Sequence, residues 1–371
     1  MKNPNSNRSA VTALVTCSWL GACIAACSSD ATRVDGARPG AGPGELPGDA
    51  QSADPDEPAT SAGASPFKSL AAAANAPDIF AAPRAGVPLA NDALAFIATA
   101  IDATGLVANE ADGSADLAGP RAAIFLKPAG AAAPRLLYAG EQLVSPLVIE
   151  ASADGSTLYV ADYAGGSDGS GAILSLPAQG GAAALLAQGY SPRSVTLGPE
   201  DELYFSGVDP VSGEPGVFAL HGDAVTTVFS GAPLVDPSGI ALFADGRVLV
   251  ADTRLFDGSV DAQALDGEAG VVLLERGAAR IFATGFATGF PAGIALTLDE
   301  STLIISGQGP DRSDTVYLVN VAHPEQAPTP VTAAFSAYQD SSAGLKRAHG
   351  ENTFIWASLS ANGGTVFEIT N

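Results

Sequence analysis

Short aliphatic and aromatic runs, separated by turns rich in Gly, Pro and Asp, recur through most of this sequence. Four segments open with proline and carry an aliphatic residue three positions later, at 146–149, 192–195, 237–240 and 291–294; residues 342–345 continue the series without the proline. Eight residues after each proline stands an acid: Asp154, Glu200, Asp245 and Asp299. This spacing of about 45 to 54 residues predicts an internal structural repeat.

Each repeat contains further runs with the length and residue types of β-strands. Second runs follow the acidic turns at 157–160, 203–205, 248–250, 302–305 and 353–356. Third runs occur six times, at 122–126, 172–174, 217–220, 271–274, 316–319 and 365–367. Fourth runs follow most of these, at 135–138, 184–186, 227–229 and 280–282.

Four short antiparallel strands in each of six repeats predict an all-β fold, a six-bladed β-propeller over residues 77–371. The sixth repeat reaches Asn371 directly after its third strand. Near the N-terminus, residues 78–81 match a fourth strand, that of residues 280–283. We therefore expect residues 78–81 to pair with residues 365–369, which would complete the last blade and remove two exposed sheet edges.

The repeats resemble those of NHL and SMP-30/gluconolactonase-like propellers. The likeness is clearest in Ala153-Asp154-Gly155 followed by residues 158–162, and in Ala244-Asp245-Gly246 followed by residues 248–252. The resemblance implies the fold, and it offers one activity, that of a calcium-dependent hydrolase. No Glu and Asn ligand set transfers residue by residue, and the motif residues are mainly turn and packing residues, so the resemblance says little about activity.

The N-terminus predicts export and a lipid anchor. Lys2 and Arg8 precede an uncharged apolar stretch, so that residues 1–26 have the pattern of a signal peptide. The segment Ile24-Ala25-Ala26-Cys27 resembles the lipobox of bacterial lipoproteins, in which the cysteine thiol accepts the lipid. The segment Leu20-Gly21-Ala22-Cys23, earlier in the sequence, fits the same pattern. An ordinary secretory signal with incidental cysteines is the simpler alternative.

Residues 27–76 predict a lipidated cysteine followed by a disordered tether rich in Ala, Gly, Pro, Ser and Asp. Ser28 follows the cysteine, which by resemblance to lipoprotein sorting favours the outer membrane of the cell envelope. All three cysteines lie in the first 27 residues, so the exported domain contains no disulfide and no thiol chemistry.

Charge narrows the choice of partner. All 40 acids and 15 of the 17 cations follow Cys27, which gives the exported chain a net charge of −25. Nucleic acid and anionic lipid are poor partners for such a chain. A cation or a basic partner suits it better, with plain solubility as the simpler explanation. We expect a monomer that contacts the membrane through its lipid.

Acids gather in the loops between second and third strands, chiefly at 102–120, 162–170 and 252–269. Carboxylates on one face could hold calcium, which takes six to eight oxygen ligands. Asp162 and Asp252 are the best candidates because they end second strands near the channel mouth. A structural alternative is that each accepts hydrogen bonds from the backbone of its loop.

The first strands line the predicted channel and bring four cations to it: Arg84, Arg193, Lys346 and Arg347. His221, His323 and His349 fall on the face opposite the acidic loops, which disfavours histidine as a base on that loop face. We therefore predict a non-catalytic module that binds a protein, glycan or small molecule through its acidic loop face. The alternative is a metal-dependent lactonase- or esterase-like hydrolase, and no other cofactor is expected.

Overall fold

The computed structural model describes residues 69–89, 92–101, 120–255, 269–288, 291–308, 314–330, 342–358 and 364–370. All of them belong to a single compact unit spanning 63–371, and every regular element in them is a strand. The predicted signal peptide 1–26, which contains Cys23, and residues 27–68, which begin with Cys27, lie outside the described residues, as do the acidic segments 102–119 and 256–268. In the described part, no helix is long and apolar enough to cross a membrane.

The strands form four-stranded antiparallel blades. The first blade comprises β2 (Phe80–Pro88), β3 (Leu94–Ala100), β4 (Arg121–Lys127) and β5 (Arg135–Tyr138). The second comprises β6 (Pro146–Ala151), β7 (Thr157–Asp162), β8 (Ala172–Pro177) and β9 (Ala184–Gln188). The third comprises β10 (Ser194–Leu197), β11 (Leu203–Val208), β12 (Pro215–His221) and β13 (Ala224–Ser230).

The fourth blade comprises β14 (Pro237–Leu242), β15 (Val248–Asp252), β16 (Gly270–Glu275) and β17 (Ala278–Thr284). The fifth comprises β18 (Ile294–Leu296), β19 (Thr302–Gln308), β20 (Asp314–Asn320) and β21 (Thr329–Pro330). The last comprises β22 (Ser342–Arg347), β23 (Thr353–Ser358), β24 (Thr365–Thr370) and, from the N-terminal side, β1 (Ser69–Ala74).

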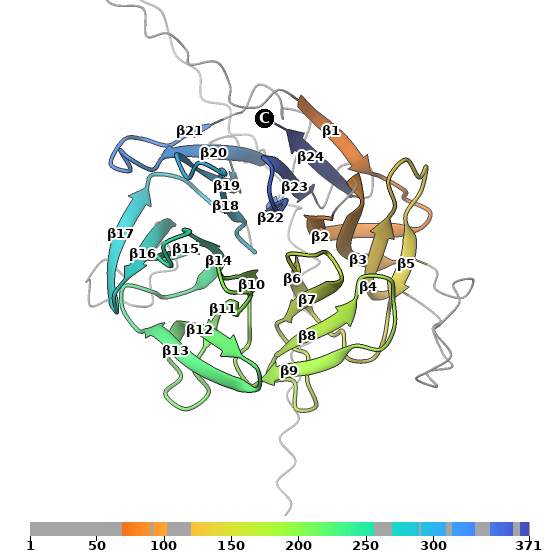
Figure 1. Ribbon diagram of the computed structural model, residues 1–371, viewed down its shortest axis with the longest axis horizontal. Coiled ribbons are helices and arrows are strands. Elements are labelled where there is room, and N and C mark those ends of the chain that lie inside the picture. Colours follow the sequence, from red (N-terminus) through yellow and green to blue (C-terminus); the bar gives the residue numbers. More distant parts are fainter. Residues whose placement is uncertain are drawn as a thin grey trace, which may run out of the picture. The chain divides into compact units, whose positions relative to one another are not determined.

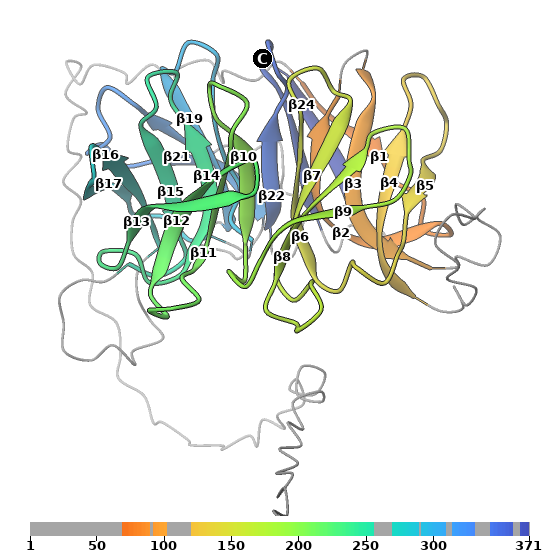
Figure 2. The ribbon, with the colours of Figure 1, turned by 60° about the horizontal axis from the view of Figure 1, so that its bottom comes forward.

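These blades form a closed ring, so the predicted propeller is confirmed. The first strands contact one another in the cyclic order β2, β6, β10, β14, β18, β22 and back to β2 (Figure 1). A single parallel pair, Ala85 with Gly344, joins the first and last blades into one eight-stranded sheet. Seen from the side, the blades stand around a common axis with their strands running between two loop faces (Figure 2).

An N-terminal strand closes the ring, but the predicted segment was wrong. β1 pairs with β24, Ser69 opposite Thr370 and Ala72 opposite Phe367. The side chain of Asn75 then donates to Thr365 Oγ1 at 2.7 Å. Phe80 pairs instead with Ala100 in the first blade. The ring therefore begins at Ser69, inside the predicted tether, because an outer strand can be made from small side chains that give no sequence signal.

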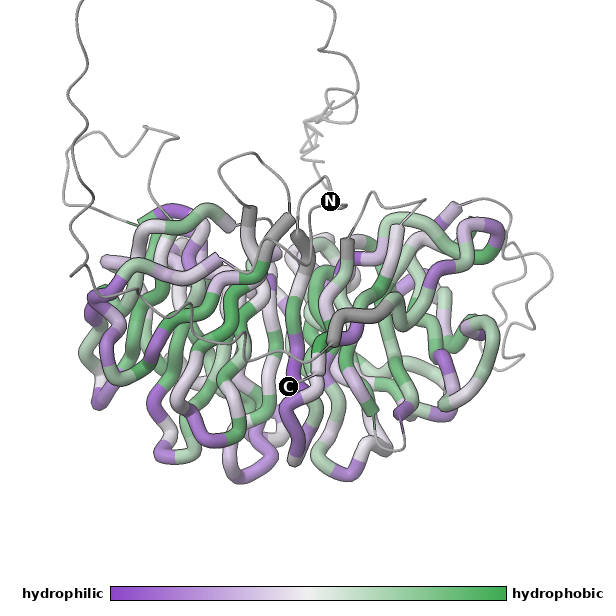
Figure 3. The backbone as a smooth tube through the Cα atoms, turned by 90° about the horizontal axis from the view of Figure 1, so that it is seen from above, coloured by the Kyte–Doolittle hydropathy of each residue, from purple (hydrophilic) through white to green (hydrophobic). Residues whose placement is uncertain are grey.

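Apolar side chains fill the spaces between neighbouring blades, and Figure 3 shows the hydrophobic segments concentrated within the ring wall. In the first blade, the rings of Phe80, Phe96 and Phe125 pack together, with centroids 4.9 to 5.6 Å apart. Alternation along each strand sends side chains to both faces of a blade, so each blade packs against its two neighbours.

Three of the four acids that mark the repeat hold hairpin turns. The carboxylates of Asp154, Asp245 and Asp299 each accept the backbone N–H two residues later, at 2.9 to 3.1 Å. These hydrogen bonds favour the ionised form. The backbone hydrogen bonds therefore contribute to a lowered pKa in all three carboxyls. The pKa of Asp154 falls to about 2, and the hydrogen bond from the Ser152 hydroxyl makes the largest contribution there.

Glycines let the first strands meet at the centre of the ring. A Cβ on Gly293 would lie 1.9 Å from the nitrogen of Leu345, and one on Gly239 would lie 2.5 Å from the oxygen of Ala292. No water-sized sphere fits in the space lined by these residues and by Val148. Close backbone approach therefore constricts the channel at this level.

Candidate functional site

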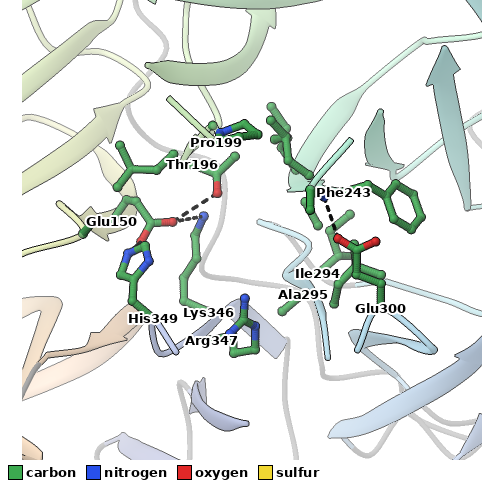
Figure 4. Close-up of a pocket in the computed structure, with 18 of the residues that line it drawn as sticks. Glu150, Thr196, Pro199, Phe243, Ile294, Ala295, Glu300, Lys346, Arg347 and His349 are labelled. Atoms are coloured by element: carbon green, nitrogen blue, oxygen red, sulfur yellow. Dashed lines mark hydrogen bonds and ion pairs between the residues drawn. The ribbon is translucent and has the colours of Figure 1, made fainter. Parts of the chain in front are cut away.

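A cavity of about 460 Å³ lies directly beyond this constriction. We call it the cup. Its lining comes from the C-terminal halves of the first strands in blades two to six and from the turns that follow them; the residues include Glu150, Thr196, Asp201, Ile240, Phe243, Ile294, Leu298, Glu300, Lys346, Arg347 and His349 (Figure 4). The cup thus lies on the face of the first-to-second turns, opposite the acidic loops on which the sequence placed the function.

One wall of the cup holds a buried ion pair. Lys346 Nζ lies 3.1 Å from Glu150 Oε2, and both side chains are less than a tenth exposed. The ammonium also donates to the carbonyl of Val195 at 2.5 Å. The Thr196 hydroxyl and the Ala151 N–H donate to the Glu150 carboxylate. These contacts connect the second, third and last blades, and they satisfy most of the capacity of both charges.

His349 stands at the edge of this wall, partly exposed. Its Nε2 lies 3.1 Å from the carbonyl oxygen of Ala151 and 3.9 Å from Glu150 Oε1. Because a carbonyl only accepts, we assign a hydrogen to Nε2, which leaves Nδ1 of the neutral ring as an acceptor. The imidazole can therefore accept a hydrogen bond from a bound molecule.

Arg347 and Glu300 line other parts of the cup. Arg347 Nη1 donates to two backbone carbonyls, Ala348 at 2.8 Å and Glu351 at 3.3 Å. Burial lowers the pKa of its guanidinium, which still remains charged at neutral pH. The Glu300 carboxylate accepts the backbone N–H of Ala244 from the neighbouring blade at 2.5 Å.

Most of the remaining lining is apolar. Ile240, Ile294 and Leu296 are nearly completely buried in the cores between blades and border the cup from behind, whereas Leu242 is half-buried and Leu298 is 47% exposed. The cup therefore combines aliphatic side chains, such as Leu242 and Leu298, with polar groups that reach it from several blades, a combination common in small-molecule sites.

The two predicted metal ligands hold loops. Asp162 accepts the backbone N–H groups of Val144, Ser145 and Ala164 at 2.8 to 3.1 Å. Asp252 repeats the arrangement with Val235, Asp236 and Arg254 at 2.8 to 2.9 Å. Burial raises the pKa of both carboxyls, that of Asp252 to about 6, against the opposing effect of these hydrogen bonds. This is the structural role that the sequence allowed as an alternative.

The described residues do not fit the calcium site that the resemblance implied. They contain no group of three or more His, Cys, Asp or Glu side chains arranged to hold a metal ion. Asp162 and Asp252 use their oxygens on backbone amides and lie in different blades. We therefore derive no chemistry through a metal.

The four predicted channel cations separate into different places. Lys346 and Arg347 line the cup. Arg193 forms an ion pair with Asp236 near the opposite mouth, where Arg254 lies 3.8 Å from the same carboxylate. Arg84 is exposed and is not part of the cup lining. Only two of the four thus contribute to the candidate site.

One feature of the sequence points to the cup, although the repeat pattern alone did not reveal it: the residue type at one position of the first-to-second turns. The left-handed position of the first-to-second turns is glycine in three repeats, at Gly155, Gly246 and Gly350. Asp92, Asp201 and Glu300 occupy it in the others, with φ of 56° to 62°. When the turns are aligned, these three acids depart from the glycine of the other repeats. Two of them, Asp201 and Glu300, line the cup.

Blades around a closed ring and a cup at one mouth place this chain in the class of β-propeller proteins. No family model matches the chain, and no curated protein matches it. Its likeness to known proteins is one of structure.

Two solved structures illustrate that likeness. The PQQ-bound aldose sugar dehydrogenase of Streptomyces coelicolor matches with a TM-score of 0.57 at 12% identity, over 81% of this chain and 98% of that one. A gluconolactonase from Xanthomonas campestris matches with a TM-score of 0.52 at 14% identity, over 81% of this chain and 89% of that one. At such identities the likeness supports the propeller fold that the repeats resemble.

Proposed function

We propose that this chain is a lipid-anchored propeller of the cell envelope that binds a small polar molecule in its cup. The cup carries the proposal, because its volume of about 460 Å³ falls within the usual range for small-molecule sites and several polar groups converge on it. Binding on this face replaces the acidic loop face as the preferred site. Much of that loop face lies in residues that the structure does not describe.

The cup can be tested by closing it from its rim. Ala153 is exposed and lines the cup, so Ala153→Trp should obstruct it with little effect on the core. The chain from Ser28 onward would be screened by thermal shift against amino acids, sugars, amines and carboxylic acids. At least one compound should raise the melting temperature of the wild type, because a ligand that binds only the native state stabilises it.

Ala132→Trp is the matched control, since Ala132 is an exposed alanine of the β4–β5 turn outside the cup lining. The stabilisation should persist in Ala132→Trp and vanish in Ala153→Trp. A screen without any stabilising compound, or equal stabilisation of both variants, would reject the cup as the binding site.

The anchor has its own test. Cys27→Ser should abolish incorporation of labelled palmitate and release the protein from the membrane fraction, whereas Cys23→Ser should leave both unchanged. The reverse result would move the lipid to Cys23. Retention of the label in both single variants and in the double variant would reject the lipoprotein proposal. An outer-membrane location rests on Ser28 and would be tested by membrane fractionation.

The metal-dependent hydrolase has weaker support. The fold of the gluconolactonase neighbour is shared at 14% identity, and His349 offers an acceptor nitrogen in the cup. The described residues supply no metal-binding group for it.

A further inference from the structure

The charges around the cup differ in how far they are already neutralised. Lys346 and Glu150 form a buried ion pair and satisfy one another. Arg347 and Glu300 are different, because the hydrogen bonds recorded for their side chains all run to backbone groups. The cup thus presents the cation Arg347 and the acid Glu300 on different blades, and neither is held in a salt bridge within the described residues. The carboxylates of Glu150 and Glu300 nevertheless attract Arg347 electrostatically.

Arg347 is suited to a carboxylate. Its guanidinium has five N–H donors, and the two recorded hydrogen bonds both come from Nη1. The outward donors can bind a carboxylate in the paired geometry that arginine prefers. Its partial burial strengthens such a contact by excluding water.

Glu300 is held in an unfavourable backbone conformation. Its φ is 56°, in the left-handed region, where the equivalent turns of three other blades use glycine. A glutamate there is strained, and such strain is concentrated at functional sites. The turn places its carboxylate against Ala244 of the preceding blade and at the cup, where Asp201 contributes a second acid from the equivalent turn of the third blade.

We infer that the cup binds a zwitterion with an apolar body, the chemistry of an aliphatic α-amino acid. In this arrangement Arg347 takes the carboxylate, Glu300 takes the ammonium group, and Leu242 and Leu298, which line the cup and are not fully buried, contact the aliphatic side chain. A simple anion is disfavoured by the net charge of −25 of the exported chain and by the acids of the cup. A simple amine supplies no carboxylate for the remaining donors of Arg347. The inference rests on the proposed binding function of the cup.

Four small probes separate these possibilities by calorimetric titration of the chain from Ser28 onward. L-leucine carries both charges and the aliphatic body, 3-methylbutylamine lacks the carboxylate, 4-methylpentanoate lacks the ammonium group and glycine lacks the body. Leucine should bind, and each of the other three should bind about tenfold or more weakly, because each loses one recognised group.

Variants assign each charge to its residue. Arg347→Gln should weaken leucine by about tenfold or more while leaving 3-methylbutylamine unchanged, and Glu300→Gln should weaken leucine while leaving 4-methylpentanoate unchanged. Glu275 is an exposed acid at the end of β16, outside the cup, and Glu275→Gln should bind leucine like the wild type. Unchanged circular dichroism and melting temperature would show that each variant is folded.

Equal binding of leucine and either singly charged analogue would overturn the zwitterion. So would a loss of leucine binding that is the same in Arg347→Gln, Glu300→Gln and Glu275→Gln. If leucine does not bind, but a compound from the screen binds and is blocked by Ala153→Trp, this inference fails and the proposed function stands. If no compound binds in a manner sensitive to Ala153→Trp, both fail.

Discussion

At the scale of single residues, the left-handed position of the first-to-second turns affects both the stability of the fold and the lining of the cup. Gly246 has a φ of 86° and open space where a Cβ would stand, so only its backbone conformation matters there. Asp201 has a φ of 62° in the equivalent turn, lines the cup and is exposed. An L-residue in this region costs about 1 to 2 kcal/mol, and glycine avoids most of that strain.

Substitutions at these two positions should change stability in opposite directions. Asp201→Gly should raise the free energy of unfolding by about 0.5 to 1 kcal/mol, because the relief of strain exceeds the additional chain entropy that glycine loses on folding. Gly246→Ala should lower it by about 1 kcal/mol. Urea unfolding measures both. A lower free energy of unfolding in Asp201→Gly would mean that the Asp201 carboxylate stabilises the turn. It would contradict the interpretation that Asp201 strains the backbone.

The buried ion pair is the second feature at this scale. Glu150 and Lys346 come from blades that are not sequence neighbours, and Lys346 also reaches Val195 of the third blade. Removing one partner would leave the other charge buried and unpaired, which is strongly unfavourable. The pair is therefore a poor target for testing ligand binding, and Arg347 and Glu300 are better ones.

At the scale of elements, the end of the second strand is fixed by one carboxylate. Asp162 and Asp252 each bind two amides of the segment that enters their blade and one amide of the loop that leaves the second strand. The same residue, at the same place in two repeats, thus joins two chain segments. Because burial raises the pKa of both carboxyls, their contribution to stability should depend on pH.

The raised pKa of Asp252 determines the direction in which stability changes with pH. Asp252 titrates at about 6 in the folded chain and near 3.8 when exposed, so the folded state holds this proton more tightly. Stability relative to Asp252→Asn should therefore be highest below pH 4, fall as the pH rises from 4 to 6, and then remain level. The decrease should be about 2 to 3 kcal/mol. Urea unfolding of wild type and variant between pH 4 and 7 measures this difference.

Asp154 provides a control of opposite sign. Hydrogen bonds from Ser152 and Ser156 lower its pKa to about 2, so its contribution to stability is present above pH 4 and is lost as the pH falls towards 2. The stability of the wild type relative to Asp154→Asn should rise with pH over that range. If Asp252→Asn gave a difference independent of pH, the carboxylate of Asp252 would have an ordinary pKa.

At the scale of the whole molecule, β1 closes the ring. It pairs with β24 along its length, and Asn75 binds Gly364 and Thr365 at its end. Ala74 is buried beside Phe80 and Phe96. Without β1 the last blade would keep three strands and expose an unpaired edge and the apolar side chains beneath it.

Truncation tests this closure. A chain that starts at Gly63 should melt at the same temperature as the chain from Ser28, because every strand of the ring is retained. A chain that starts at Ala76 should melt about 5 to 10 °C lower and bind more of a hydrophobic dye. Equal melting temperatures for the two truncated chains would show that β1 adds nothing to the ring.

The sequence by itself determined the repeat, the strand types and the closed propeller. These follow from local patterns: aliphatic and aromatic runs of strand length, and acids at turns such as Asp154 that bind the backbone two residues later. The alternation of apolar runs and turns repeats along the chain, so it can be read without knowing which blades meet. The second strands of blades two to six were predicted in this way.

Tertiary structure alone decided which strand closes the ring and where the cup lies. β1 has an alanine-rich sequence, and only its pairing with β24 identifies it as a strand. Glu150, Glu300 and Arg347 are far apart in the sequence, and ring closure brings them to one mouth of the channel. The physical reason is that local propensity acts over a few residues, whereas a shared cavity depends on blade packing, burial and the close approach allowed by Gly239 and Gly293.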